Sequence, residues 1–474
     1  MDSGNNSISA PASVSQVGRS PGRVALLMPY WDFWESSVPW DLRADRERLL
    51  SEATNIASRV CHVAASTLIP DIDTARDVGE QLTDLDAVVV VSTMAAPSSI
   101  TTTALDGLRR TPVLVWALSR SNRVDDSFSH TDITTAGSSV GAPMVTSALT
   151  RAGYRFDVVA SSLSGADVVH GAIRRVVTAG QILRRPLVTI GDPIPGYTTV
   201  VPPEGVDQFP RRVGVPASVF AEETAAVGVD EALTVVERIR EEFDVDQAVT
   251  ETALTRAAQA EVALRGIVRA TGAVAGAINC HDGSLRGNPS FGFAPCLALG
   301  RLTTDGVPFT CTGDVLTALA MFAVRGLGYP TLYHEIEALD FDSQEVILAN
   351  SGEHDLGLCS DQPLLVPNNW YLHDSIVGPC AQFSLSPGPA SLVAFVMAPE
   401  PRFVVAEGEF TSRQIPRTGV PNGAFRFHSP TLEGAWSEWI RSGVTHHSVA
   451  TTGHLATDIR AVSGLLGAQF VQVS

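Results

Sequence analysis

The sequence predicts an α/β fold in which two Rossmann-like parallel-sheet domains are followed by a mostly antiparallel β C-terminal domain. Through the first two thirds of the chain, short apolar runs typical of buried strands alternate with stretches of helical spacing. The last third carries short β-like runs separated by Pro and Gly instead. The chain has 474 residues, of which 45% are hydrophobic and 18% charged, so it can bury several cores.

Three apolar runs near the start of the chain predict strands of a first sheet. They are Val24–Met28, Ala87–Val91 and Val113–Trp116. Between the first two, Arg43–Ala64 has helical spacing, with its apolar residues on one face. Parallel strands are joined by crossovers that usually contain a helix, so this alternation predicts a parallel sheet covered on both faces.

A second alternating unit follows the first, and a long helix ends it. The unit runs through Val168–Ala179, Pro186–Ile190, Val213–Val219 and Glu231–Glu242. The long helix is expected over Val249–Ala270, where apolar residues recur at helical spacing. This second unit therefore predicts a central domain of the same class as the first.

The C-terminal third is expected to form β structure with two short helices. Strands are predicted at Leu392–Val396 and Arg402–Ala406, and helices at Thr431–Arg441 and Leu455–Leu466. The domain boundaries that fit these patterns are a disordered tail over 1–21, an N-terminal α/β domain over 22–160, a central α/β domain over 161–345 and a β-rich domain over 346–474.

Composition excludes several classes of function. The 33 basic and 51 acidic residues give a net charge of −18, which disfavours nucleic acid and anionic membranes as partners. The chain contains no lysine, so Schiff-base enzymes and the Walker A phosphate loop are excluded. No apolar run approaches the length of about 20 residues that a membrane span needs. The 6 cysteines are widely spaced, which favours free thiols in a cytoplasmic protein.

Two stretches concentrate metal-binding residue types. The first runs over 333–342 and 350–355, and the second over 443–448. Carboxylate oxygen and imidazole nitrogen together suit a divalent cation such as Mn²⁺. Solvated loops have the same composition, so these clusters alone do not establish a metal site.

Short motifs then appear in a fixed order along the second half of the chain. They are Ala277–His281, Gly292–Gly300 and Cys311–Val315, followed by Glu335 and by the pair His446-His447. In this order and spacing they resemble the L-fucose/L-arabinose isomerase family. The resemblance covers about residues 270–360 and 440–474 by motif, and the remainder of the chain by architecture only.

The resemblance implies a metal-dependent aldose–ketose isomerase that acts on an open-chain sugar through an enediolate, with Mn²⁺ or another divalent cation. It implies that Glu335 is both a metal ligand and an acid/base. His447 is implied as a ligand with His446 beside the substrate, and His354 is the nearest match to the remaining histidine ligand. Part of the metal site would then lie in the central domain. Asp314 is expected as a ligand or catalytic carboxylate, and equally as the cap of the apolar helical run that follows it.

The chain departs from the family at Thr312, where the family has its first catalytic glutamate. A threonine hydroxyl replaces neither a carboxylate ligand nor a base near neutral pH. Asp314 could take over this role, or Glu337 or Glu353 could swing in. Otherwise ordinary isomerisation is lost. The alternatives are then a divergent metal-dependent enzyme acting on another polyhydroxy compound, or a sugar-binding protein without turnover.

Aromatic residues follow the first predicted strand, where open α/β sheets place their ligand crevice. Trp31 and Trp34 could stack on a sugar, although packing at a domain or subunit interface is the commoner explanation for such residues. The resemblance implies a homo-trimer or homo-hexamer, with each site completed by a neighbouring subunit and with these tryptophans near an interface. A small-molecule sugar is the expected substrate, with Thr312 and His446 beside it.

Overall fold

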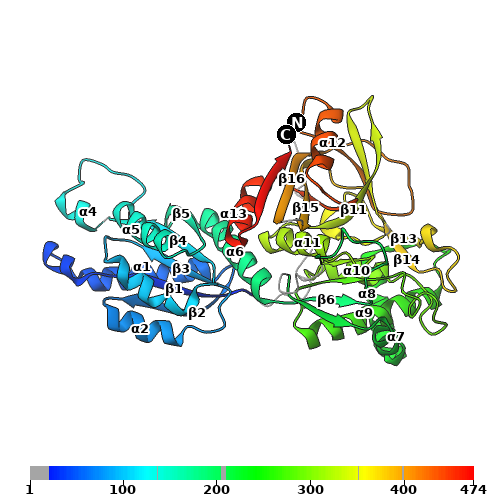
Figure 1. Cartoon of the computed structure of the whole chain (residues 1–474), viewed down its shortest axis with the longest axis horizontal. Helices are drawn as coiled ribbons and strands as arrows, with labels where there is room; N and C mark the ends of the chain where they lie inside the picture. Colours follow the sequence, from blue (N-terminus) through cyan, green and yellow to red (C-terminus); the bar gives the residue numbers. More distant parts are fainter. Residues whose placement is uncertain (1–20, 136, 204–209, 351, 398–399, 474) are drawn as a thin grey trace, which may run out of the picture.

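The computed structural model describes residues 21–135, 137–203, 210–350, 352–397 and 400–473. The tail expected over 1–21 lies outside these residues except for its last position. The molecule is elongated, with the first α/β region at one end of the long axis and the remaining elements at the other (Figure 1). Two parallel sheets and one mostly antiparallel sheet confirm the predicted fold class.

The first α/β region is built on sheet A, a parallel sheet in the order β2-β1-β3-β4-β5. Its strands are β1 (Arg23–Pro29), β2 (His62–Ile69), β3 (Ala87–Ser92), β4 (Val113–Ser119) and β5 (Phe156–Ser162). The helices are η1 (Asp32–Ser37), α1 (Leu42–Ala57), α2 (Ile72–Gln81), α3 (Ser98–Ala104), η2 (Asp106–Leu108), α4 (His130–Thr135) and α5 (Ser138–Arg151). The six side chains of β3 are all buried, as expected for a strand covered on both faces.

The helix predicted over Arg43–Ala64 is shorter in the structure. α1 ends at Ala57, and the chain then forms β2, the edge strand of sheet A. β2 pairs in parallel with β1 from Arg23↔His62 onwards. Its side chains alternate between exposed and half-buried, so the strand lacks the continuous apolar run from which the other strands were predicted.

The second parallel sheet, sheet B, has the order β10-β9-β6-β7. Its strands are β6 (Leu187–Ile190), β7 (Arg212–Val215), β9 (Ala275–Ile278) and β10 (Phe309–Thr310). The accompanying helices are α7 (Ala217–Ala226), α8 (Val229–Glu242), α9 (Glu251–Thr271), α10 (Cys296–Thr304) and α11 (Val315–Leu327). A small sheet beside them contains β8 (Asp244–Val245), β13 (Leu364–Pro367) and β14 (Pro379–Gln382), with η3 (Leu356–Leu358) and η4 (Asn369–Tyr371) nearby in sequence.

The C-terminal β structure is sheet D, in the order β15-β18-β11-β12-β17-β16-β19, and an additional β15–β16 pairing closes six of these strands into a ring. The strands are β11 (Leu332–Asp340), β12 (Glu345–Ala349), β15 (Gly388–Met397), β16 (Pro401–Phe410), β17 (Asn422–Phe427), β18 (His447–Thr452) and β19 (Gln469–Val473). Two helices accompany them, α12 (Leu432–Arg441) and α13 (Ala456–Leu466). The sheet begins at β11, so Glu335 belongs to this sheet and precedes the boundary expected at 345.

Two helices connect these layers. α6 (Ala166–Arg184) packs on β3, β4 and β5 of sheet A and also on α11 and α13. α11 lies between sheet B and sheet D and contacts β9, β15 and β18, which explains why almost all of its side chains are buried. Its first residue follows the end of sheet B closely, so the start of α11 lies where the two sheets meet. None of the helices in the described part of the chain is long and apolar enough to cross a membrane.

Candidate metal centre

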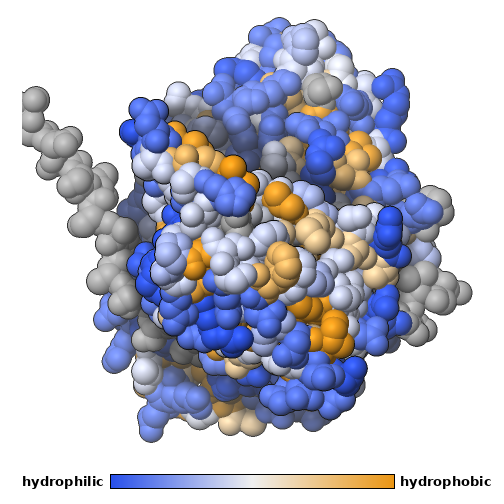
Figure 2. Space-filling view, turned by 90° about the vertical axis from the view of Figure 1, so that its left-hand side faces the viewer, coloured by the Kyte–Doolittle hydropathy of each residue, from blue (hydrophilic) through white to orange (hydrophobic). Residues whose placement is uncertain are grey.

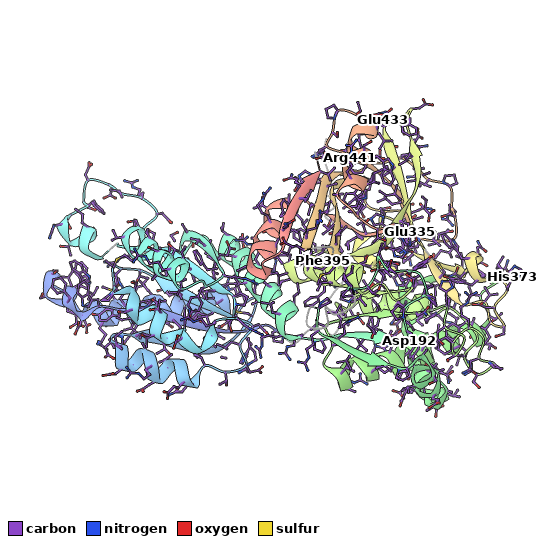
Figure 3. All side chains as sticks on the ribbon, in the orientation of Figure 1. Asp192, Glu335, His373, Phe395, Glu433 and Arg441 are labelled. Atoms are coloured by element: carbon purple, nitrogen blue, oxygen red, sulfur yellow. The ribbon has the colours of Figure 1, made fainter. Side chains whose placement is uncertain are left out.

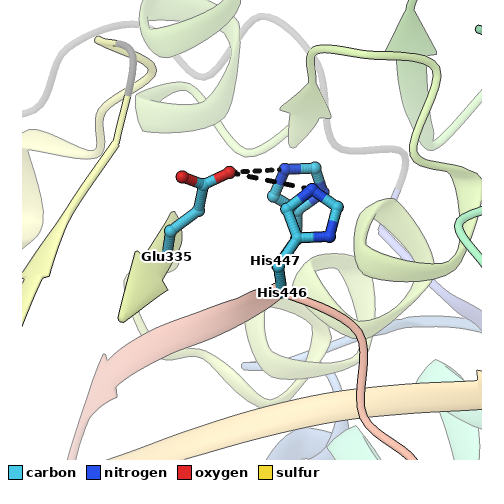
Figure 4. A group of neighbouring side chains, drawn as sticks. All are labelled: Glu335, His446 and His447. Atoms are coloured by element: carbon cyan, nitrogen blue, oxygen red, sulfur yellow. Dashed lines mark ion pairs between the residues drawn. The ribbon is translucent and has the colours of Figure 1, made fainter. Parts of the chain in front are cut away.

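Three predicted site residues converge where sheet D meets sheet B. Glu335 on β11 lies directly opposite His447 on β18 in the antiparallel register. Glu335 Oε1 is 2.9 Å from His447 Nε2 and 3.8 Å from His446 Nε2. The ligand atoms of these residues all lie within 4.8 Å of one another, and no other three His, Cys, Asp or Glu side chains do so in the described part of the chain. Figure 3 places Glu335 inside this half of the molecule, and Figure 4 shows one carboxylate oxygen facing both imidazoles.

Both histidines of the consecutive pair face Glu335, although neighbouring residues of a strand point to opposite faces. This is because β18 begins only at His447, and the chain bends at His446. The two imidazole rings lie 3.8 Å apart between centroids. His446 Nδ1 is 3.1 Å from the Thr445 hydroxyl, which leaves Nε2 directed toward Glu335.

Asp314 supports His447 from the opposite side. Thr312 and Gly313 adopt left-handed backbone conformations, with φ of 56° and 74°, and turn the chain from β10 into α11. Asp314 then caps α11, because Oδ1 accepts a hydrogen bond from Thr317 N at 2.8 Å. Oδ2 is 2.8 Å from His447 Nδ1 and also accepts the Thr317 hydroxyl at 2.8 Å. Asp314 is fully buried, and both of its carboxylate oxygens are engaged by Thr317 and His447. It therefore lies behind His447 and is not one of the three metal-binding donors.

The charges at the site perturb the side-chain pKa values in opposite directions. Burial lowers the pKa of His447, but hydrogen bonds and charge from Asp314 and Glu335 outweigh it and raise the pKa to about 9. Burial alone would raise the pKa of Glu335, and His447 holds it below its usual value. Burial and the charge of His447 together lower the pKa of His446. In the absence of a metal ion, His447 therefore carries a proton between two carboxylates.

The side chain of Thr312 contacts another hydroxyl group, that of Tyr333. Thr312 donates a hydrogen bond to the Cys311 carbonyl at 2.8 Å, and its oxygen is 3.1 Å from the hydroxyl of buried Tyr333. The Tyr333 ring packs on His447 with 4.6 Å between centroids. A further carboxyl belongs to exposed Glu337, two residues along β11, which shares a hydrogen bond with Glu335. Burial and that neighbouring carboxylate raise the pKa of Glu337.

His354, Trp31 and Trp34 lie elsewhere. His354 is buried beside Phe243, with 5.5 Å between ring centroids, and so close to Gly300 that a Cβ there would overlap its ring. Burial lowers its pKa to about 3. Trp31 and Trp34 belong to the segment after β1, at the end of the molecule opposite sheet D (Figure 1). Figure 2 views that end and shows hydrophobic patches among hydrophilic side chains.

Sequence reasoning missed Tyr197, in the loop that follows β6. Its ring meets the His446 ring edge to face, with 5.6 Å between centroids and an angle of 90°. Thr199 of the same loop lies 3.4 Å from the Thr445 hydroxyl. The available signal was the Pro195-Gly196 pair after a predicted strand, which is typical of a tight turn at a ligand-facing edge.

The three donors fit a divalent cation. One carboxylate and two imidazoles leave coordination positions open, and this donor set suits Mn²⁺, Fe²⁺ and Co²⁺. A metal-binding histidine usually donates its other ring N–H to a carboxylate or carbonyl, as His447 does to Asp314. The residues that could hold a metal are therefore Glu335, His446 and His447, with Asp314 fixing the orientation of His447.

Comparison with known proteins gives two matches. Residues 332–469 match the family described as the L-arabinose isomerase C-terminal domain. The chain is also 26% identical over 339 residues to a protein named L-arabinose isomerase from Acidothermus cellulolyticus. The aligned stretch covers 67% of this chain and 63% of that relative, so the chain spans less than two thirds of the relative's length. The matched domain contains all three candidate metal ligands, whereas Asp314 precedes it.

Proposed function

Because this chain belongs to the L-fucose/L-arabinose isomerase family, we propose that it is a metal-dependent aldose–ketose isomerase acting on an open-chain sugar. The observation that carries the proposal is the convergence of Glu335, His446 and His447, each offering one ligand atom within 4.8 Å of the others. We propose Mn²⁺, or a divalent cation of similar ligand chemistry, as the ion that they hold.

A bound cation would polarise two neighbouring sugar oxygens and stabilise the negative charge that develops when the C2 proton leaves. The protein must supply a carboxylate that moves this proton between C2 and C1. Glu335 suits this role because only one of its oxygens faces the histidines, and the other points away from them (Figure 4). The lowered pKa of Glu335 keeps it ionised and able to accept a proton near neutral pH.

We assign the second acid/base to Glu337 in place of the missing carboxylate at Thr312. Glu337 is two residues from Glu335 on β11, at an irregularity of the β11–β12 pairing, and its carboxyl group shares a hydrogen bond with that of Glu335. The hydrogen bond between the two carboxyl groups supports a proton held between them. Burial and the neighbouring carboxylate raise the pKa of Glu337 toward the range in which a carboxyl group exchanges protons with a substrate, which supports an acid/base role.

The substrate site is proposed to be completed by a neighbouring subunit in a homo-trimer or homo-hexamer. The segment after β1 that carries Trp31 and Trp34 belongs to the sheet A end of the molecule, whereas Glu335 lies in the other half (Figures 1 and 3). Phe33 between them is 58% exposed, and its ring stacks on Trp31 with 4.6 Å between centroids. An exposed aromatic group of this kind supports contact with another subunit and its sugar.

A second candidate is a protein that binds a sugar or another polyhydroxy compound without ordinary isomerisation. The observation favouring it is Thr312, which places a hydroxyl where the family has a glutamate. In this case the metal centre would bind ligand, but no proton would leave C2.

Deuterium exchange distinguishes the two candidates. The protein would be loaded with Mn²⁺ and incubated in D₂O with a panel of aldoses and ketoses, and proton NMR would follow C2 of the aldoses and C1 of the ketoses. The isomerase proposal expects deuterium at these carbons with at least one sugar. The matched variant Glu335→Gln should show none, because it loses the carboxylate with little change in size. A folded, Mn²⁺-loaded wild-type protein that exchanges no sugar would support the binding protein instead.

A further inference from the structure

The loop after β6 holds one aromatic ring against the metal centre. Ile194 accepts a hydrogen bond from Tyr197 N at 3.0 Å, which closes a tight turn around Pro195 and Gly196. Gly196 has a φ of 89°, a conformation that glycine adopts without strain, and proline before it fixes the turn. The sequence of this turn therefore fixes the backbone position from which the Tyr197 side chain extends.

Both ends of this loop are attached to the scaffold. On the β6 side, Asn279 Nδ2 donates to the Asp192 carbonyl at 2.7 Å. On the other side, the Val200 carbonyl accepts Leu316 N of α11 at 3.3 Å, and the Val200 side chain is fully buried. The segment between these anchors is short, so the position of Tyr197 is tied to sheet B and to α11.

His446 lies between this loop and His447. The Tyr197 ring meets the His446 ring edge to face, with 5.6 Å between centroids. The centroid of the His447 ring lies 3.8 Å from that of His446. Thr199 reaches Thr445, whose hydroxyl in turn is 3.1 Å from His446 Nδ1. The bend before β18 gives His446 no ladder partner in sheet D, so these side-chain contacts are what orient its ring.

We propose that Tyr197 is a positioning residue of the metal centre, which holds the His446 imidazole with Nε2 directed at the site shared with Glu335. The inference rests on the proposed metal-dependent function. It assigns to the loop after β6 of sheet B a part in a centre whose ligands lie on β11, on β18 and in the bend before β18. The Tyr197 side chain is 39% exposed, and within the described residues its hydroxyl makes no hydrogen bond. The ring, and not the hydroxyl, is therefore the group that acts.

Two variants separate the ring from the hydroxyl. Tyr197→Phe keeps the ring, and Tyr197→Ala removes it from a partly exposed loop position. The first readout is the NMR spectrum of histidine ring signals in the metal-free full chain, with His446 assigned by His446→Gln. We expect Tyr197→Phe to leave the His446 signals at their wild-type positions and Tyr197→Ala to displace them.

The second readout is the dissociation constant for Mn²⁺ alone, measured by calorimetry. Loss of a group that orients a metal ligand weakens binding by about 10–100-fold, so Tyr197→Ala should raise the dissociation constant by that factor. Tyr197→Phe should stay within about twofold of wild type, and Tyr197→Ala should have no further effect in a His446→Gln background.

The two readouts separate failure of this inference from failure of the proposed function. Unchanged His446 signals in folded Tyr197→Ala would overturn the positioning role. So would a full effect of Tyr197→Ala in the His446→Gln background. A wild-type chain that binds no Mn²⁺ would instead refute the metal-dependent function. The metal-free NMR comparison would still decide whether Tyr197 orients His446.

Discussion

The carboxyl ends of the strands in sheet A and in sheet B are equivalent places in two parallel sheets, yet among the described residues only the edge at sheet B carries a group of three metal-binding side chains. At sheet A, the segment after β1 presents Trp31 and Phe33, with Phe33 58% exposed. At sheet B, the segment after β10 runs directly into Asp314, over which β11 and β18 of sheet D lie. The general rule for ligand crevices applies to both edges. The difference is that a second sheet covers only one of them.

Covering the edge changes the strength of its electrostatic interactions. Beside the aromatic segment of sheet A, the Arg43 and Glu35 side chains are 47% and 46% exposed and 3.7 Å apart, so their ion pair is worth about 0–1 kcal/mol. The His447 and Asp314 side chains are 2% and 0% exposed and 2.8 Å apart. Removal of one partner from such a buried pair leaves the other uncompensated. Substitutions should therefore have large effects at sheet B and small effects at sheet A.

The largest difference is expected between His447→Ala and Trp34→Phe. His447→Ala removes a proposed direct ligand, so the Mn²⁺ dissociation constant should rise by more than about 100-fold, beyond the effect of losing an outer partner. Trp34→Phe, at the sheet A edge, should leave it within about twofold. Calorimetric titration measures both values.

A matched histidine sharpens this first prediction. His354→Ala removes a buried imidazole that lies outside the donor group. It should leave Mn²⁺ affinity unchanged while lowering the free energy of unfolding through the cavity that it creates. A loss of Mn²⁺ affinity in folded His354→Ala equal to that of His447→Ala would show that the centre is not the one described.

The next largest effect is expected from Asp314→Asn. Asparagine caps a helix as well as aspartate does, so α11 should be retained. The amide carries no charge to hold His447, and the Mn²⁺ dissociation constant should rise by about 10–100-fold. Unfolding by denaturant provides the control, because a cooperative transition shows that the variant is folded, and weakened binding in a folded variant assigns the effect to His447. Wild-type affinity in Asp314→Asn would mean that this carboxylate does not support the centre.

The same contrast explains what could be predicted from the sequence. Apolar runs predicted β1, β3 and β4 because strands covered on both faces must be apolar throughout. The edge strand β2 escaped prediction because its side chains alternate. Glu335 and the histidine pair were found by a resemblance in motif, but their convergence depends on the β11–β18 register, which pairs segments more than a hundred positions apart in the chain.

His354 and Tyr197 show the limits of that reasoning. His354 follows Glu335 in an acidic, histidine-containing stretch, yet the chain between them includes an irregularity of β11 pairing at Ile336/Ala338 and the turn into β12. Counting residues across such a hairpin does not give the side on which a side chain emerges. Tyr197 lies in a loop of sheet B far from the ligands in sequence, and the two regions meet only in the fold, through the Tyr197–His446 ring contact and the approach of Thr199 to Thr445.

The stability of the metal-free protein and its affinity for Mn²⁺ should both depend on pH, because both involve the proton on His447. The pKa of His447 is raised to about 9 by Asp314 and Glu335, so in the metal-free protein its proton stabilises the fold below its unfolded value of about 6.5, and this contribution is lost as the pH rises through about 9. The same proton competes with a metal ion. Mn²⁺ affinity should therefore increase by up to about tenfold per pH unit and level off near pH 9.

The control for this profile is Asp314→Asn, which removes one of the two charges that raise the pKa of His447. Its affinity should level off at a lower pH than that of the wild type. Calorimetry between pH 6.5 and 9 follows both proteins. A flat wild-type profile over this range would mean that His447 loses no proton when the metal binds.

The smallest effect is expected at Thr312, which combines a strained backbone with a hydroxyl contact. Its φ of 56° is unusual for a β-branched residue and costs about 1–2 kcal/mol, whereas its contact with Tyr333 is worth about 0.5–1.5 kcal/mol. Thr312→Ala loses the contact and keeps the strain, and Thr312→Gly loses both. The free energy of unfolding should therefore be about 1 kcal/mol higher for the glycine variant than for the alanine variant. Chemical denaturation measures the difference. Equal stabilities would mean that the backbone at position 312 is not strained. The hydroxyl contact with Tyr333 would then be the only contribution of Thr312 to stability that this comparison detects.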